Sequence, residues 1–403
     1  MKKKSVAIIG TVGVPANYGG FETLAEHLID HLGDRYDIHV YCSGKKYKKE
    51  ERKDSYKNAR LHYIPLEANG IQSIPYDTWS IIHALFFADV LLVLGVSGAW
   101  LLPFVKLFTN KKIIVSIDGI EWKRNKWNMF AKLYLFWAES LAVKYSHIDI
   151  SDNEAIQDYT AQRYGTLSRI IEYGADHTIQ KSSTAATSDY PITAHPYAFK
   201  VCRIEPENNV HVVLKAFSDM PEYRLVMVGN WNSSDYGRNL KETYQGFPNI
   251  TILDPIYDQQ KLDQIRSNAV LYIHGHSAGG TNPSLVEAMY LGLPIITFGV
   301  SYNKVTTENK ALYFNTEEDL KRIVQSTRLA DFQKMGVAMG EIAKRRYTWH
   351  IIADKYNGLV HEALQAGTKP SVAADSEALP YDELLSMGLS HIKYTENFYS
   401  QRN

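Results

Sequence analysis

Short apolar runs alternate with amphipathic segments along most of this 403-residue chain. The runs at residues 90–95 and 113–117 consist almost entirely of β-branched residues and leucine, which is typical of parallel strands buried on both faces. Segments such as residues 20–32 instead have the apolar spacing of helices. Because helices must cover both faces of a parallel sheet, the pattern predicts an α/β fold.

The alternation occurs in two series, separated at residues 180–188 by a stretch rich in serine, threonine and alanine. It predicts strands at residues 6–10, 38–42, 60–64, 90–95, 113–117, 145–150 and 169–172, and then at 197–202, 224–229, 250–253, 270–274 and 295–298. Two doubly wound domains in succession would face a crevice with the carboxyl ends of their strands, where such folds bind ligands. We therefore expect domains at residues 1–180 and 181–345, followed by an amphipathic helix at 346–364 within a C-terminal segment, 346–403.

The composition of the chain argues against several classes of partner and site. Lys+Arg and Asp+Glu number 44 each, so no overall charge favours nucleic acid or a membrane. Two cysteines, Cys42 and Cys202, make neither a disulfide framework nor a zinc site. The most apolar stretch, residues 81–107, is interrupted by Asp89 and Lys106 and is unsuited to span a bilayer. We expect a soluble, cytoplasmic protein.

Residues 276–294 contain the clearest signal of ligand binding. Asn282 is a suitable N-cap, Pro283 falls at the first helical position, and Glu287 follows about one turn later. A glycine turn leading into such a helix start can bind an anion, because free N–H groups and the helix dipole both face it. An ordinary loop–helix–strand unit would have the same pattern, so this segment alone leaves both interpretations open.

Two further segments offer groups for a phosphate. The first loop, residues 10–22, lacks the G-x-G-x-x-G spacing of a dinucleotide site, but Gly19 and Gly20 would let a phosphate or sugar approach the backbone. The alternative is a loop that needs glycine for positive φ. Arg203 follows the strand expected at 197–202, where a guanidinium suits a diphosphate; the alternative is a surface salt bridge.

Asp118 and Glu121 follow the strand expected at 113–117, so either could act as a base or accept a hydrogen bond from a hydroxyl. Asp118 could equally cap a helix. His274 and His276 lack a third metal ligand nearby, and we expect them to form hydrogen bonds or serve a structural role.

An aromatic and basic cluster at residues 122–137 fits either a membrane interface or core packing, and core packing is the favoured interpretation.

Taken together, these residues resemble the GT-B glycosyltransferases of family 4, retaining enzymes that use nucleotide sugars. The family's "GRL-x-PEK" segment matches residues 202–208, and its "E-x7-E" segment matches residues 279–287. The resemblance implies two Rossmann-like domains facing across a cleft, with the C-terminal helix crossing back to the first, acceptor-side domain. Together with the residue chemistry above, it leads us to expect catalytic roles for Asp118, Glu121 and Arg203. It also implies donor contacts at Gly19, Gly20, Arg203, Gly279, Gly280, Thr281, Asn282, Ser284 and Glu287.

Three positions depart from that family. Gly279 stands where an acid contacts the donor sugar, Asn208 stands where a lysine joins the arginine, and Asp118 lies near the place of a catalytic histidine. In these departures the chain is similar to bacterial rhamnosyltransferases of polysaccharide assembly. That likeness implies dTDP-L-rhamnose as the donor and a sugar-diphospholipid acceptor at the cytoplasmic face of the cell membrane.

Other functions stay open. The chain could be a nucleotide-sugar epimerase on the same fold or, given Gly279 and Asn208, a non-catalytic subunit that binds a sugar nucleotide. The first-loop spacing disfavours an NAD oxidoreductase. No Asp-x-Asp pair stands at a suitable strand end, so we expect neither a metal nor another cofactor.

Overall fold

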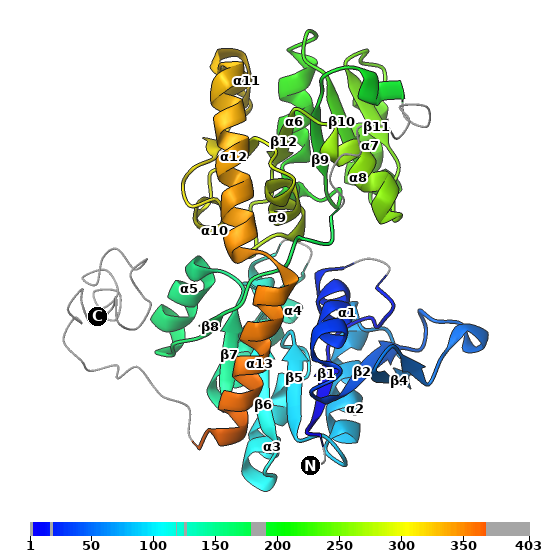
Figure 1. The fold of residues 1–403 in the computed structure, drawn as a ribbon. Coiled ribbons are helices and arrows are strands. Elements are labelled where there is room, and N and C mark those ends of the chain that lie inside the picture. Colours follow the sequence, from blue (N-terminus) through cyan, green and yellow to red (C-terminus); the bar gives the residue numbers. More distant parts are fainter. Residues whose placement is uncertain (1–2, 17–18, 118, 125–126, 179–190, 368–403) are drawn as a thin grey trace, which may run out of the picture. The chain divides into compact units, whose positions relative to one another are not determined.

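The computed structural model describes residues 3–16, 19–117, 119–124, 127–178 and 191–367 (Figure 1). The chain forms two compact units, one made of Met1–Ile171 with Ala353–Asn403 and the other of Glu172–Ile352. Each unit contains its own largely parallel sheet. Helix α13, Trp349–Gln365, begins in the second unit and continues into the first.

The first unit contains an eight-stranded sheet in the order β3-β4-β2-β1-β5-β6-β7-β8. All neighbouring strands pair in parallel except β3 and β4. The strands are β1 Ser5–Ile9, β2 Asp37–Ser43, β3 Ser55–Tyr56, β4 Ala59–Ile64, β5 Val90–Leu94, β6 Lys112–Ser116, β7 Ile148–Ser151 and β8 Arg169–Ile170. The α-helices are α1 Gly20–Leu32, α2 Ser73–Ala84, α3 Leu102–Phe108, α4 Met129–Tyr145 and α5 Glu154–Tyr164.

The core of this unit explains why the central strands are so apolar. Alternate residues of β1, β5 and β6 enter one buried cluster with residues of α2, α3, α4 and α5. Helix α13 crosses the sheet region in Figure 1, and Leu359, Val360 and Ala363 near its end are buried. Strands covered on both faces need apolar side chains in both directions, as the sequence pattern predicts.

The second unit contains a six-stranded, wholly parallel sheet in the order β11-β10-β9-β12-β13-β14. Its strands are β9 Ala198–Val201, β10 Leu225–Val228, β11 Ile250–Leu253, β12 Leu271–His274, β13 Ile295–Phe298 and β14 Leu312–Phe314. Its helices are α6 Val210–Ser218, α7 Asp235–Tyr244, α8 Gln259–Ser267, α9 Pro283–Tyr290, α10 Ser301–Thr306, α11 Glu317–Ser326 and α12 Leu329–Arg346. The strand order reverses between β9 and β12, and in this class of sheet ligands bind at that switch point.

Three expectations need correction. The strand predicted at 145–150 begins later, at Ile148, because Tyr145 still belongs to α4. The helix predicted at 346–364 begins three residues later, as α13 at Trp349, because Arg346 is the last residue of α12. Contacts within the second unit hold this break: the Ala175 amide donates to the Tyr347 carbonyl at 2.7 Å, and the Trp349 amide donates to a carboxylate in the same segment.

The third correction concerns the aromatic cluster at 122–137, for which core packing was favoured. Trp122, Trp127 and Tyr134 do pack against the core of the first unit. Phe130 and Trp137 are exposed on α4 instead. The stretch expected as a linker at 180–188 and the tail beyond residue 367 lie outside the described residues.

None of the helices described is both long enough and apolar enough to cross a lipid bilayer.

Candidate donor-binding site

The carboxyl end of β9 carries Arg203, the cation expected for a diphosphate. Its side chain is about half exposed, and its Nε lies 3.8 Å from Oε2 of Glu205. An exposed ion pair at that distance contributes little to stability. The guanidinium can therefore leave this pair for a stronger, bidentate partner such as a diphosphate.

Asn208, which stands where the resemblance leads one to expect a lysine, ties two loops together. Its Nδ2 donates to the Arg203 carbonyl at 2.8 Å, and its Oδ1 lies 2.8 Å from Nδ1 of His276. The Ser277 amide also donates to the carbonyl of Glu207 at 2.8 Å. Asn208 is buried, so its amide fixes the loop after β12 against the loop after β9. His276 has the hydrogen-bonding role that the sequence indicated.

Gly279 has a backbone conformation that favours glycine. Its φ is +112°, in the left-handed region that side chains rarely adopt, and a Cβ there would lie 3.3 Å from Nε2 of His276. An acid at this position would therefore strain the loop as it stands. The absence of the family's acid fits the local backbone. The chain continues through Gly280 to Thr281, whose side chain is buried.

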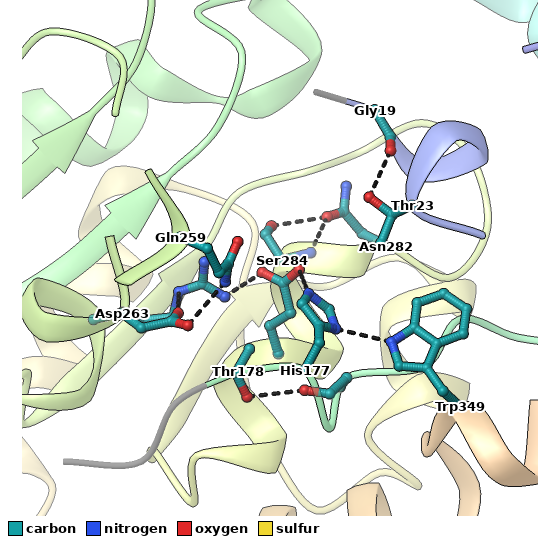
Figure 2. A network of polar contacts seen from close by, with 12 residues as sticks. Gly19, Thr23, His177, Thr178, Gln259, Asp263, Asn282, Ser284 and Trp349 are labelled. Atoms are coloured by element: carbon teal, nitrogen blue, oxygen red, sulfur yellow. Dashed lines mark hydrogen bonds and ion pairs between the residues drawn. The ribbon is translucent and has the colours of Figure 1, made fainter. Parts of the chain in front are cut away.

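Helix α9 begins as the sequence predicts. The Asn282 side chain caps it, with Oδ1 accepting hydrogen bonds from the Ser284 amide at 3.0 Å and the Ser284 hydroxyl at 2.8 Å (Figure 2). Pro283 occupies the first turn. The cap orients a helix start whose amide groups and dipole favour an anion.

Glu287 lies on α9 within a network of polar side chains, of which Figure 2 labels His177 and Asp263. Its carboxylate pairs with Nη1 of Arg266 on α8 and with Nε2 of His177 at 3.2 Å. Arg266 is fully buried, and its Nε lies 3.7 Å from Oδ1 of Asp263. Burial alone would raise the pKa of the Glu287 carboxyl, but the charge of Arg266, with His177, outweighs it and holds the pKa at about 2. Glu287 is therefore ionised and able to accept hydrogen bonds from hydroxyl groups.

The orientation of His177 is fixed from its other side. Its Nδ1 accepts a hydrogen bond from Nε1 of Trp349 at 2.9 Å, which leaves Nε2 to carry the proton toward Glu287. Neither His177 nor Arg266 was predicted as a site residue. Their partners are 110 and 21 residues away in sequence, and no local spacing signals either contact.

In the first unit, Gly19 and Gly20 form the start of α1. Gly19 has a φ of +133°, and a Cβ there would lie 1.8 Å from Oε2 of Glu22. That carboxylate accepts a hydrogen bond from the Val12 amide at 2.6 Å, and the Thr23 hydroxyl donates to the Gly19 carbonyl at 3.0 Å. The turn itself therefore requires glycine at position 19. This structural role of Gly19 is compatible with a ligand contact.

Asp118 and Glu121 are the two carboxylates predicted as bases. Asp118 lies outside the described residues. Glu121 lies in a short 3-10 turn, where Oε2 pairs with Nη1 of Arg124 at 3.1 Å and Oε1 accepts from Nε1 of Trp127 at 3.0 Å. Both oxygens of Glu121 are thus engaged, which favours a role in holding the loop over one as a base.

Across the part of the chain that the structure describes, no group of three or more His, Cys, Asp or Glu side chains is arranged to hold a metal ion.

Comparison with known proteins assigns a class to this fold. Residues 189–341 match a family described as "Glycosyl transferases group 1", and residues 3–176 match a "Domain of unknown function (DUF1972)". No curated protein gives a significant match.

Solved structures share the fold at low identity. Sucrose-phosphate synthase from Thermosynechococcus elongatus is 15% identical with a TM-score of 0.73, over 89% of this chain and 99% of that chain. HepE from Anabaena, in complex with UDP and glucose, is 14% identical with a TM-score of 0.67, over 89% and 100%. A glycosyltransferase from Rickettsia africae is 14% identical with a TM-score of 0.67, over 91% and 100%.

The chain therefore has the GT-B fold of two Rossmann-like domains. The group 1 match over the second unit, taken with that fold, supports a glycosyltransferase.

Proposed function

We propose that the chain transfers a sugar from a nucleotide-sugar donor, with retention of configuration and without a metal. One arrangement in the second unit carries the proposal: the capped start of α9 at Asn282, with ionised Glu287 one turn further on. The group 1 match covers this arrangement. UDP is bound in the HepE structure, which favours a nucleotide-linked donor for this chain too.

Each group of the proposed donor site then has a chemical task. The amide groups around Thr281–Ser284 and the Arg203 guanidinium bind the diphosphate, and Glu287 accepts hydrogen bonds from the ribose hydroxyls. Gly280 lets the donor approach the backbone. As the bond from the sugar to the diphosphate breaks, these preset donors stabilise the charge on the leaving group. The acceptor hydroxyl attacks the anomeric carbon from the same face, and its proton passes to the leaving phosphate oxygen, so no separate base is required.

The donor we propose is dTDP-L-rhamnose. This rests on the similarity to bacterial rhamnosyltransferases and on Gly279. A 6-deoxy sugar has one hydroxyl fewer to bind, which is compatible with losing the acid at that position. A direct test incubates the protein with dTDP-rhamnose, UDP-glucose, UDP-galactose or GDP-mannose and a lipid-diphosphate sugar, and measures product mass. Transfer from another donor alone would refute the rhamnose assignment, and no transfer from any donor would refute the proposed function.

The acceptor we propose is a lipid-diphosphate-linked sugar, used at the inner face of the cell membrane. Support comes from an apolar face on α2, α3 and α4, which cover the same side of the first sheet. Phe86, Leu107 and Phe130 are each at least 75% exposed there. Other large apolar side chains exposed on or beside these helices are Trp79, Ile82, Phe104, Phe108, Met129, Leu133, Phe136 and Trp137.

The sequence around α3 and α4 is rich in basic residues. Residues 99–137 contain seven lysines and arginines and two acidic residues, although the whole chain has no net charge. Exposed aromatic and aliphatic side chains with basic neighbours are typical of proteins that lie on a membrane surface.

Vesicle sedimentation tests the membrane contact. The wild-type protein should sediment with vesicles containing anionic lipid and less with neutral ones. Changing both Leu107 and Phe130 to serine should abolish binding, whereas changing Leu329 and Val337, exposed apolar residues of the second unit, should not. Equal binding by both double variants would contradict this surface. Loss of self-association without loss of vesicle binding would identify it as a contact between copies.

A non-catalytic subunit that binds a sugar nucleotide is the second candidate. Glycine at position 279 and asparagine at position 208, where the resembled family has an acid and a lysine, favour it. Tight nucleotide binding with no turnover across the donor and acceptor panel would support this candidate. An epimerase would instead convert a donor in the absence of acceptor.

A further inference from the structure

A lysine is buried at the carboxyl end of the central strand of the second unit. Lys200 belongs to β9, and only 1% of it is exposed. Among the described residues no carboxylate forms an ion pair with it. Burying an ammonium group without a counter-charge is unfavourable, so such a group is retained where it has a function or an anionic partner arrives from outside.

Within the described part of the chain, the contacts of Lys200 are with groups other than carboxylates. Its ammonium interacts with the thiol of Cys202 and lies near the imidazole of His274, on the neighbouring strand β12. A Cβ on Gly275 would lie 2.8 Å from the Lys200 Nζ, so glycine at that position leaves room for the ammonium. The Nε2 of His274 is buried without a hydrogen-bond partner. The Lys200 ammonium and the His274 imidazole, from adjacent strands, therefore lie close together, and neither is paired with a carboxylate of the described residues.

The titration behaviour of these groups reflects that imbalance. Burial lowers the pKa of Lys200, and the Cys202 thiol opposes this only in part. Burial, and then the charges of Lys200 and His276, lower the pKa of His274 well below its usual range. The remaining charged groups near the Cys202 thiol are Glu205 and Arg203, which pair with each other. An anion placed here would raise the pKa of Lys200 and stabilise its charged form.

Lys200 lies close to the place where ligands bind in this fold. Strands β9 and β12 pair with Ala198 opposite Leu271 and Phe199 opposite Tyr272, so Lys200 comes next along the same edge. The strand order reverses between these two strands. The loop that follows β12 begins at Gly275 and continues to Gly279 and the start of α9, the diphosphate site proposed above.

We propose that Lys200 supplies the positive charge for the donor diphosphate that Asn208 cannot supply. This inference rests on the proposed function. The ammonium acts from beneath the loop after β12, through the low-dielectric interior, where a charge acts more strongly than in water. Lys200 thus forms a pair of cations with Arg203, one buried and one half exposed, although the lysine of the family pattern is missing.

A binding experiment on the full-length protein tests this role. Calorimetry should measure dTDP, UDP and thymidine with wild type, Lys200→Met, Lys200→Arg and the control Lys215→Met, which removes an exposed lysine paired with Asp219. Lys200→Met should weaken dTDP binding about 10- to 100-fold, the scale of one interaction with a charged group, and leave thymidine unchanged. Lys200→Arg should restore most of the dTDP affinity, and the control should match wild type.

Several results would overturn the inference. Unchanged dTDP affinity in Lys200→Met would do so while leaving the proposed function intact. Equal losses for dTDP and thymidine would indicate a structural role. If wild type bound neither dTDP nor UDP, the proposed function itself would fail. Should Lys200→Met not fold, the wild-type protein provides the test: its dTDP affinity should fall as the solution becomes alkaline and Lys200 loses its proton, since burial lowers the pKa of this lysine. A flat profile would contradict the inference.

Discussion

The pairing of Glu287 with buried Arg266 makes a sharp prediction about stability. The Glu287 carboxyl has a pKa of about 2, against an ordinary value of 4.5. That difference corresponds to about 3 kcal/mol of folding free energy. Because the folded pKa is the lower one, this stabilisation is present above about pH 5 and is lost as the pH falls toward 2.

Replacing Arg266 alone and replacing Glu287 alone should lower the free energy of unfolding by different amounts. Arg266→Met leaves Glu287 and Asp263 without the guanidinium between them, and we expect a loss of about 3–5 kcal/mol. Glu287→Gln leaves Arg266 its contact with Asp263, so the loss should be smaller. The double variant should lose less than the sum, since neither charge is then left without the other.

Hydrogen exchange in a urea series is the suitable assay, because a chain with two units need not unfold in one step. Peptides covering α8 and α9 report the free energy of opening around Arg266 and Glu287, and peptides from β1 and β5 serve as the internal control. Strictly additive losses in the double variant would refute the reasoning. So would a Glu287→Gln effect that persists unchanged at pH 3, where much of the stabilisation from this carboxylate should already be gone.

Three further predictions follow from single sites. Arg203→Ala should reduce turnover about 100- to 1000-fold in a transfer assay, the scale of one lost transition-state donor, with little change in melting temperature. Burial, followed by the charge of His39, lowers the pKa of His62 to about 4; the melting temperature of the first unit should therefore fall as the pH drops from about 6.5 toward 4, and His62→Gln should reduce that dependence. Gly279→Glu should not restore activity and should cost about 1–3 kcal/mol in urea unfolding, because of the positive φ at that position.

The sequence predicts most of the framework, for a physical reason. Parallel strands covered on both faces leave a plain apolar run, and β11 and β13 begin and end where that pattern places them. The cap of α9 is also local, since Asn282 and Pro283 suffice to define it. By contrast, β14 has only three residues, too few for a pattern to show.

The parts of the site that the sequence does not predict depend on contacts between distant segments. His177 and Arg266 meet at Glu287 only because a loop and a helix are brought to α9 by the fold. The break between α12 and α13 is likewise fixed by Ala175, which is far from it in sequence. Side-chain direction limits prediction in another way: on α4 the aromatic residues alternate between core and surface, and composition alone does not separate the two groups.

Two of the three departures from the glycosyltransferase pattern that the sequence resembles, Asn208 and Gly279, are connected through one side chain. Oδ1 of Asn208 accepts a hydrogen bond from Nδ1 of His276, and the position of a Cβ on Gly279 lies 3.3 Å from Nε2 of the same ring. A lysine at 208 could only donate, which would force the other tautomer or remove the contact that holds the two loops. The side chain of an acid at position 279 would then lie against a His276 ring that no longer had its hydrogen bond to residue 208. The side chains at positions 208 and 279 therefore constrain each other through His276, although position 208 lies in the loop after β9 and position 279 in the loop after β12. Asparagine at position 208 lacks the positive charge of a lysine, and Lys200 can supply that charge from β9.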